Sequence, residues 1–136
     1  MKNADKLDII KAFIYMGYFR AFILFVPFNK LRNKMGKVKV ESAEDVEEFE
    51  YIKAKRIASI IGIVAPKTPW ESKCLVQALT AQKMLKKQGI STTLYLGVKK
   101  DKDNQMIAHA WTRCGKYFVT GGVNRYGYAV VAKFSS

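Results

Sequence analysis

Two residues in this chain of 136 have side chain types and a spacing that suit nucleophilic catalysis, Cys74 and His109. Cys74 opens a stretch with helical spacing, and His109, which is the only histidine, follows 35 residues later in a strand-like run. The dipole of a helix favours a thiolate at its first residues, and a nearby imidazole can take the thiol proton. The pair therefore indicates a cysteine nucleophile with a histidine base.

Each of these residues also has a purely structural explanation. A lone cysteine on a helix is often a small buried core residue, and a histidine in a strand is often a satisfied structural residue. Alternation along the strand places His109 and Cys114 on opposite faces, so Cys74 is the better partner for His109. Trp111 shares the face of His109, where it either lines a peptide groove or packs in the core.

Other kinds of site find little support in the residue types present. One histidine and two cysteines match no zinc pattern, and Gly121-Gly122 is too short for a phosphate-binding loop, so we expect neither a metal nor a cofactor. Two cysteines also make a disulfide framework improbable and favour a reducing, cytoplasmic setting. The N-terminal residues carry two acids and lead to no cleavage site, so no signal peptide is predicted.

The charge of the chain is strongly positive, with 24 basic against 11 acidic residues and a net charge of +13. Such a balance favours an anionic partner, which includes nucleic acid, a membrane surface or an acidic peptide. The basic residues are scattered and no nucleic-acid motif accompanies them, so we do not expect a nucleic-acid partner.

The elements that must position the pair begin with an apolar stretch from Ile9 to Phe28. We interpret it first as a helix buried on most sides, and the alternatives are an interfacial membrane helix and a docking surface for a partner protein. The membrane alternative draws on the basic residues that follow, Lys30, Arg32, Lys34, Lys37 and Lys39. Residues 29–40 are predicted as a basic connector broken at Gly36.

Two further helices are predicted. The first is capped by Ser42, runs to Val64 and is ended by Pro66. The second carries Cys74 and ends near Gln88, with Gly89 as its stop signal. Its cap is either Thr68 or Ser72, and the second choice places Cys74 in the first turn, where the dipole acts most strongly.

Strand patterns replace helical ones after Gly89. Strands are predicted over 90–98, 106–114, 117–120 and 126–134, with a charged hairpin loop at 99–104 and a break at Gly121-Gly122. Helices followed by an antiparallel sheet predict an α+β fold. We expect a single domain over residues 1–136, with a helical part at 1–66 and a core of Cys-helix and sheet at 67–136.

Four ordered motifs resemble those of the lasso-peptide leader peptidases, a family of the transglutaminase-like (cysteine protease-like) superfamily. They are Pro69-Trp70-Glu71-Ser72-Lys73-Cys74-Leu75-Val76-Gln77-Ala78-Leu79, Leu85-Lys86-Lys87-Gln88-Gly89-Ile90, Leu94-Tyr95-Leu96-Gly97-Val98 and Ala108-His109-Ala110-Trp111. The likeness spans about residues 57 to 122, roughly half of the chain. It implies a papain/transglutaminase-like core.

The resemblance also implies an activity and partners. It implies a cytosolic enzyme that removes the leader from a ribosomal precursor peptide, with Cys74 as nucleophile and His109 as base and then acid. Trp70 and Trp111 are the candidate substrate-binding residues. The implied partners are the precursor peptide, a separate leader-recognition protein and an ATP-using lasso cyclase.

One position departs from the family pattern. The family usually has an Asp about a dozen residues after the histidine, and here Thr120-Gly121-Gly122 offers no carboxylate. The group that orients His109 is then Thr120, Asn124 or a backbone carbonyl. The departure keeps two other functions open, a non-catalytic module that binds a peptide or partner and a basic binder of membrane surfaces.

Overall fold

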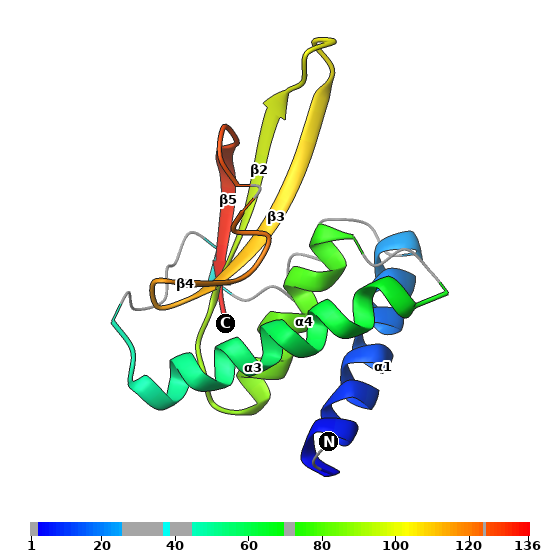
Figure 1. The fold of residues 1–136 in the computed structure, drawn as a ribbon. Helices are drawn as coiled ribbons and strands as arrows, with labels where there is room; N and C mark the ends of the chain where they lie inside the picture. The colour runs from blue at the N-terminus through cyan, green and yellow to red at the C-terminus, as the bar shows by residue number, and fades with distance from the viewer. Residues whose placement is uncertain (1–2, 26–36, 39–44, 70–72, 124) are drawn as a thin grey trace.

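Helices come first along the chain and most of the sheet follows, in a computed structural model that describes residues 3–25, 37–38, 45–69, 73–123 and 125–136 (Figure 1). The helices are α1 (Asn3–Phe25), α3 (Glu48–Val64) and α4 (Cys74–Lys87), and a 3-10 turn, η2 (Ala65–Lys67), follows α3. The strands are β1 (Lys37–Val38), β2 (Thr93–Lys100), β3 (Met106–Cys114), β4 (Tyr117–Thr120) and β5 (Ala129–Ser135). They form one antiparallel sheet in the order β1-β5-β2-β3-β4, so the predicted α+β class is confirmed.

The predicted bounds of the strands hold best where turns are short. Strands β3 and β4 have the predicted bounds, and the chain breaks at Gly121 as expected. Strand β2 begins at Thr93 rather than Ile90 and continues to Lys100, so the hairpin loop is shorter than predicted. Strand β5 begins at Ala129 rather than Tyr126 and ends at Ser135, one residue later than predicted. The connector prediction missed β1, which pairs Lys37 with Ser135 of β5. The other residues of the predicted connector all lie outside the described part of the chain.

Helix α4 begins at Cys74 itself, with Lys73 as its N-cap residue. Because Lys73 holds the N-cap position, Thr68 does not, and the Thr68 hydroxyl donates a hydrogen bond to the carbonyl of Ala65. Ser72 lies outside the described residues. The helix ends at Lys87, with Gln88 as its C-cap residue. Gly89 follows with a φ of +76° and stops the helix, as predicted. Cys74 therefore occupies the first helical position.

Helix α3 starts later than predicted, at Glu48 rather than after Ser42. A capping box fixes this start, because the Glu47 side chain accepts a hydrogen bond from a backbone N–H of the first turn and the Glu50 side chain accepts one from the Glu47 N–H at 2.9 Å. Ser42 lies outside the described residues. The helix ends at Val64, as predicted.

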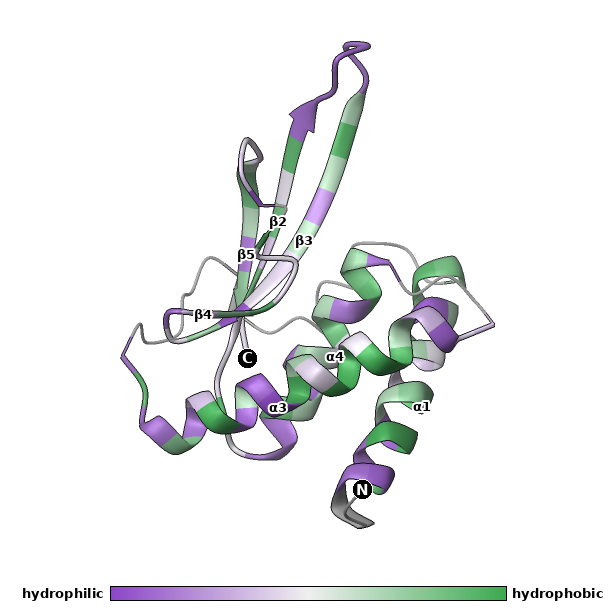
Figure 2. Cartoon of the chain, viewed as in Figure 1, coloured by the Kyte–Doolittle hydropathy of each residue, from purple (hydrophilic) through white to green (hydrophobic). Residues whose placement is uncertain are grey.

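Helix α1 corrects the expectation that the apolar stretch is buried on most sides. Its buried side chains are Ala12, Met16 and Phe19, whereas a row of apolar side chains on the helix is exposed: Leu7, Ile10, Ile14, Tyr18 and Phe25. The hydrophobic colouring of α1 in Figure 2 therefore covers solvent-facing residues as well as core ones. Residues 26–28 of the predicted helix lie outside the described residues. Within the described part of the chain, no helix is long and apolar enough to cross a membrane.

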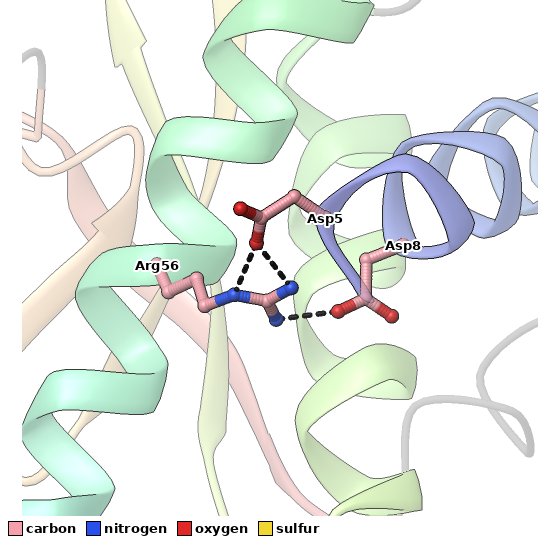
Figure 3. A network of polar contacts seen from close by, with 3 residues as sticks. All are labelled: Asp5, Asp8 and Arg56. Atoms are coloured by element: carbon pink, nitrogen blue, oxygen red, sulfur yellow. Dashed lines mark hydrogen bonds and ion pairs between the residues drawn. The ribbon is translucent and has the colours of Figure 1, made fainter. Parts of the chain in front are cut away.

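An arginine fastens α1 to α3 (Figure 3). Arg56 of α3 donates from Nε and Nη2 to Oδ1 of Asp5, at 2.9 and 2.6 Å, and from Nη1 to Oδ2 of Asp8. The hydrogen bonds to Asp8, and then those to Asp5, raise the pKa of the guanidinium above its usual value. The first turns of α1 are thereby held against α3.

The two faces of the sheet have different neighbours. Helix α4 covers the face that carries Leu94, Ala110 and Phe134, and Thr112 donates a hydrogen bond from Oγ1 to the carbonyl of Ala78 at 3.0 Å. Beyond the helices, the β2–β3 hairpin projects away from the molecule and ends in a hydrophilic tip (Figures 1 and 2). The opposite face of the sheet carries His109.

Candidate active site

Cys74 is placed by the N-terminus of α4. Cys74, the first residue of the helix, is half-buried, and it packs against a core cluster that includes Phe19, Ala78 and Leu79. The first N–H groups of a helix have no carbonyl partner within the helix. The thiol therefore lies among backbone donors that suit a negative charge.

His109 lies on β3 just beyond the end of β4. Strand β4 ends at Thr120, which pairs with Thr112, so the chain leaves the sheet before it reaches the level of His109. The departing loop brings the carbonyl oxygen of Gly121 within 2.9 Å of His109 Nε2. A carbonyl can only accept a hydrogen bond, so Nε2 carries the proton and Nδ1 is left as the basic nitrogen of the neutral ring.

Gly121 is required by this contact. Its φ is +68°, and a Cβ atom there would lie 2.7 Å from the Ala110 carbonyl oxygen and 2.9 Å from His109 Nε2. Both distances are shorter than van der Waals contact allows. Only a residue without a side chain lets the loop meet the imidazole in this way.

Aromatic rings surround the imidazole on its other sides. His109 stacks on Trp111 at 5.6 Å between ring centroids and lies 5.3 Å from the ring of Tyr128. Directly opposite His109 on β2 is Gly97, where a Cβ atom would lie 2.8 Å from the indole of Trp111. The missing side chain at this position therefore makes room for the stack that fixes the ring of His109.

Cys74 and His109 line one cavity of about 920 Å³. Its wall also includes Lys73, which is the N-cap residue of α4, Gln77 of α4, all of β4 and the loop that contains Gly121. No hydrogen bond joins the two candidate residues, both of which lie in the described part of the chain. The arrangement provides a thiol at a helix start and an oriented imidazole across one open cavity.

The two candidate substrate-binding residues are Trp111 and Trp70. Trp111 is buried, with 4% of its surface exposed, and its ring stacks on Tyr95 as well as on His109. Trp70 lies outside the described residues. Neither tryptophan is thereby tested as a substrate-binding residue.

Of the three groups left open as orienters of His109, the backbone carbonyl is the one in contact with it. Asn124 lies outside the described residues, and Thr120 Oγ1 is buried with no hydrogen-bond partner in the described part of the chain. The carbonyl belongs to the residue 12 positions after His109, where the sequence offered only the absence of a carboxylate as a signal. Sequence reasoning also missed Gln77 and Arg125, which share the cavity with the pair.

Among the described residues, no three His, Cys, Asp or Glu side chains gather as a metal site requires.

A family model described as "Transglutaminase-like superfamily" matches residues 22–133, which is most of the chain. No curated protein and no solved structure matches this chain.

Proposed function

Because the chain belongs to the transglutaminase-like superfamily, which includes cysteine peptidase-like members, we propose that it is a cysteine peptidase that removes the leader from a ribosomally made precursor peptide, as in lasso-peptide maturation. The observation that carries the proposal is the shared cavity of Cys74 and His109, in which Gly121 orients the imidazole. The ordered motifs around Cys74 and His109 support the choice of substrate class.

In the proposed reaction, Sγ of Cys74 attacks the carbonyl carbon of the scissile bond while Nδ1 of His109 takes the thiol proton. The tetrahedral oxyanion receives hydrogen bonds from backbone N–H groups at the start of α4, including that of Cys74. His109 then gives its proton to the leaving amine, which is the N-terminus of the core peptide. Water, deprotonated by the same imidazole, hydrolyses the thioester and releases the leader as an acid.

The free protein has no hydrogen bond between the thiol and the imidazole, so the proposal includes a closing step. Catalytic hydrogen bonds are often long in unliganded enzymes and shorten when the substrate binds. The open cavity leaves room for the peptide between the two side chains. A leader-recognition protein would deliver the precursor to it, and an ATP-using cyclase would act on the freed amine.

The test combines thiol labelling with cleavage of a peptide mixture. Iodoacetamide alkylation of Cys74 is followed by peptide mass spectrometry from pH 5 to 9, in the wild type and in His109→Ala, with Cys114 as the internal control. We expect the labelling of Cys74 at neutral pH to depend on His109. We also expect Cys74→Ala to lower peptide cleavage by at least about 10³-fold. An unchanged cleavage rate in Cys74→Ala would refute the peptidase.

A second candidate is a non-catalytic peptide-binding module. The lack of a hydrogen bond between Cys74 and His109, together with the missing family carboxylate, favours it. Under this alternative, Cys74 reacts as an ordinary thiol with or without His109, and peptides bind to the cavity without being cleaved.

A further inference from the structure

Helix α1 carries a continuous row of apolar side chains on the side that α3 and α4 leave open. The row consists of Leu7, Ile10, Ile14, Tyr18 and Phe25, whose exposed fractions lie between 47% and 83%. At 3.6 residues per turn, the row occupies about 80° of the helix circumference and runs for about 27 Å along the axis. Exposed apolar patches mark interaction sites on proteins, and a straight stripe suits a flat, extended surface.

The charged residues that border the row on α1 are basic. Lys6 lies on one side of the row and Lys11 lies on the other, and both are exposed. The two acidic residues of the helix, Asp5 and Asp8, lie on the opposite side, where Arg56 of α3 binds both (Figure 3). The row and its borders therefore combine apolar and basic side chains, and neither acidic residue of α1 lies among them.

Helix α4 adds further basic residues beside the row. A cavity of about 240 Å³ is lined by Ile14 of the row and by Lys83 of α4, and a cavity of about 390 Å³ is lined by Lys11 of α1 and Lys87 of α4. The acidic residue that lines the second cavity is Asp8, which already belongs to the ion pair with α3. The side of the row that is turned towards α4 is therefore rich in lysine.

An apolar stripe bordered by lysines matches the chemistry of an anionic lipid bilayer. The apolar side chains of an interfacial helix enter the boundary between headgroups and acyl chains, while lysine side chains extend to the phosphate groups. Each lysine near a surface of anionic lipids strengthens the attraction, and the net charge of +13 acts in the same direction. A second copy of this chain offers no such complementarity, because it carries the same positive charge.

We propose that α1 lies in the headgroup region of an anionic lipid bilayer, with the row turned towards the acyl chains and Lys6 and Lys11 at the phosphate groups. The helix then lies parallel to the membrane surface, since its inner side stays packed on α3 and α4. This inference is independent of the proposed peptidase, because no residue of α1 lines the cavity of Cys74 and His109.

The test is binding of the full chain to lipid vesicles, measured by co-sedimentation. One set of vesicles is phosphatidylcholine alone, and the other contains one quarter phosphatidylglycerol, which carries a negative charge. We expect binding to the anionic vesicles to be at least about tenfold tighter and to weaken as salt is added. Equal binding to the two sets, or binding to neither, would overturn the proposal.

A double variant tests the apolar row. Ile10→Gln with Ile14→Gln should weaken binding to the anionic vesicles at least about tenfold, because apolar burial in the interface is lost. The matched control is Met106→Gln with Val131→Gln, at two strand positions that are 64% and 62% exposed. It should change the affinity less than about twofold. Equal weakening in the two double variants would show that α1 is not the contact.

A second double variant tests the charges beside the row. Lys6→Gln with Lys11→Gln should weaken binding to the anionic vesicles at least about tenfold and reduce the preference over neutral ones. Lys100→Gln with Lys102→Gln removes the same charge from exposed positions at the hairpin and should change the affinity less than about twofold. Equal effects of the two pairs would mean that binding reports only the net charge, and the proposal would fail.

The depth of the row has a direct readout that does not depend on lost binding. Ile14→Trp places an indole in the row, and we expect vesicles with brominated acyl chains to quench its fluorescence beyond the quenching of the two native tryptophans. Val131→Trp is the control and should show no added quenching. Added quenching in neither variant would contradict the proposed orientation. A wild-type chain that dimerises without lipid, when Ile10→Gln with Ile14→Gln stays monomeric, would assign the row to a second copy instead.

Discussion

The acceptor on His109 is a neutral carbonyl, which fixes the tautomer of the ring without bringing a negative charge to it. A carboxylate in the same place would also stabilise the imidazolium that forms when the thiol proton moves. The orienting role and the electrostatic role are therefore separated in this chain. We expect the proposed peptidase to be slower than one with a carboxylate at this position.

Gly121→Ala tests the orienting role directly. The new Cβ meets the Ala110 carbonyl and His109 Nε2, so we expect the ring to move and the reactivity of Cys74 towards substrate or iodoacetamide to fall about 10- to 100-fold. Gly89→Ala is the matched control, since Gly89 also has a positive φ, +76°, but no atom within 4 Å of its Cβ position. Both variants should lose roughly 1–2 kcal/mol of unfolding free energy to backbone strain.

The single histidine makes the result readable by NMR. Long-range ¹H–¹⁵N spectra of histidine-labelled protein should show the tautomer with the proton on Nε2, unchanged in Gly89→Ala and altered in Gly121→Ala. A proton on Nδ1 in the wild type would contradict the contact with Gly121.

Cys114 is expected to behave as a protected thiol. Burial is the main cause that raises the pKa of its thiol; Glu50 raises it further and Arg113 lowers it. The unfolded chain therefore loses this proton first, from about pH 8.5, and stability falls as the pH rises from there towards the native pKa. Urea unfolding from pH 7 to 10 should show a steeper alkaline loss in the wild type than in Cys114→Ala. Parallel curves would contradict the expectation.

The identities of single side chains were enough to predict Cys74 and His109 as the candidate pair, but they did not predict how the two side chains are placed. Cys74 and His109 stand out by type, whereas the orienter is a backbone atom whose place depends on a positive φ at Gly121. The contact of Arg113 with Tyr95 was likewise hidden, because the two residues are 18 positions apart in sequence and meet only through the antiparallel register of β2 and β3.

Secondary structure elements were predictable where the period of the pattern and a stop signal agree. Alternation and the Gly115-Lys116 turn locate β3 and β4 to the residue. The start of α3 was misplaced because Ser42 and Glu47 are both plausible caps, and the reciprocal bonds of Glu47 and Glu50 decide between them. The two-residue strand β1 is too short to leave any periodic pattern.

The contact of α1 with α3 is expected to depend on Arg56. In Arg56→Ala, Asp5 and Asp8 lose a charged partner that is one third exposed, so we expect a loss of roughly 1–3 kcal/mol in unfolding free energy. Lys55→Ala, an exposed neighbour on the same helix, should change it by less than about 0.5 kcal/mol. Urea denaturation at pH 7 measures both. Equal losses in the two variants would show that the three-residue network adds no stability of its own.

At the scale of the whole molecule, the described part of the chain leaves one face of an apolar helix, α1, exposed. The sequence of α1 is apolar on nearly all sides, a pattern that usually means burial all round. In this fold, α3 and α4 cover only the side that carries Ala12, Met16 and Phe19. Periodicity cannot show this, because it reports which residues are apolar and not how many neighbouring elements the rest of the chain supplies.

Paired truncations decide whether the outer row of α1 is exposed in solution. Met16 is fully buried, so Met16→Ala should lower the unfolding free energy by about 2–5 kcal/mol. Ile10 is 55% exposed, so Ile10→Ala should lower it by less than about 0.5 kcal/mol. Both variants place alanine in the same helix, and the difference in helix propensity between Met and Ile is only a few tenths of a kcal/mol, far below the cost expected for Met16→Ala. The measurement is urea denaturation at several protein concentrations.

A large cost for Ile10→Ala that grows with concentration would mean that a second copy covers the row, since only association makes stability depend on concentration. A large cost at all concentrations would instead mean that other parts of the same chain cover it.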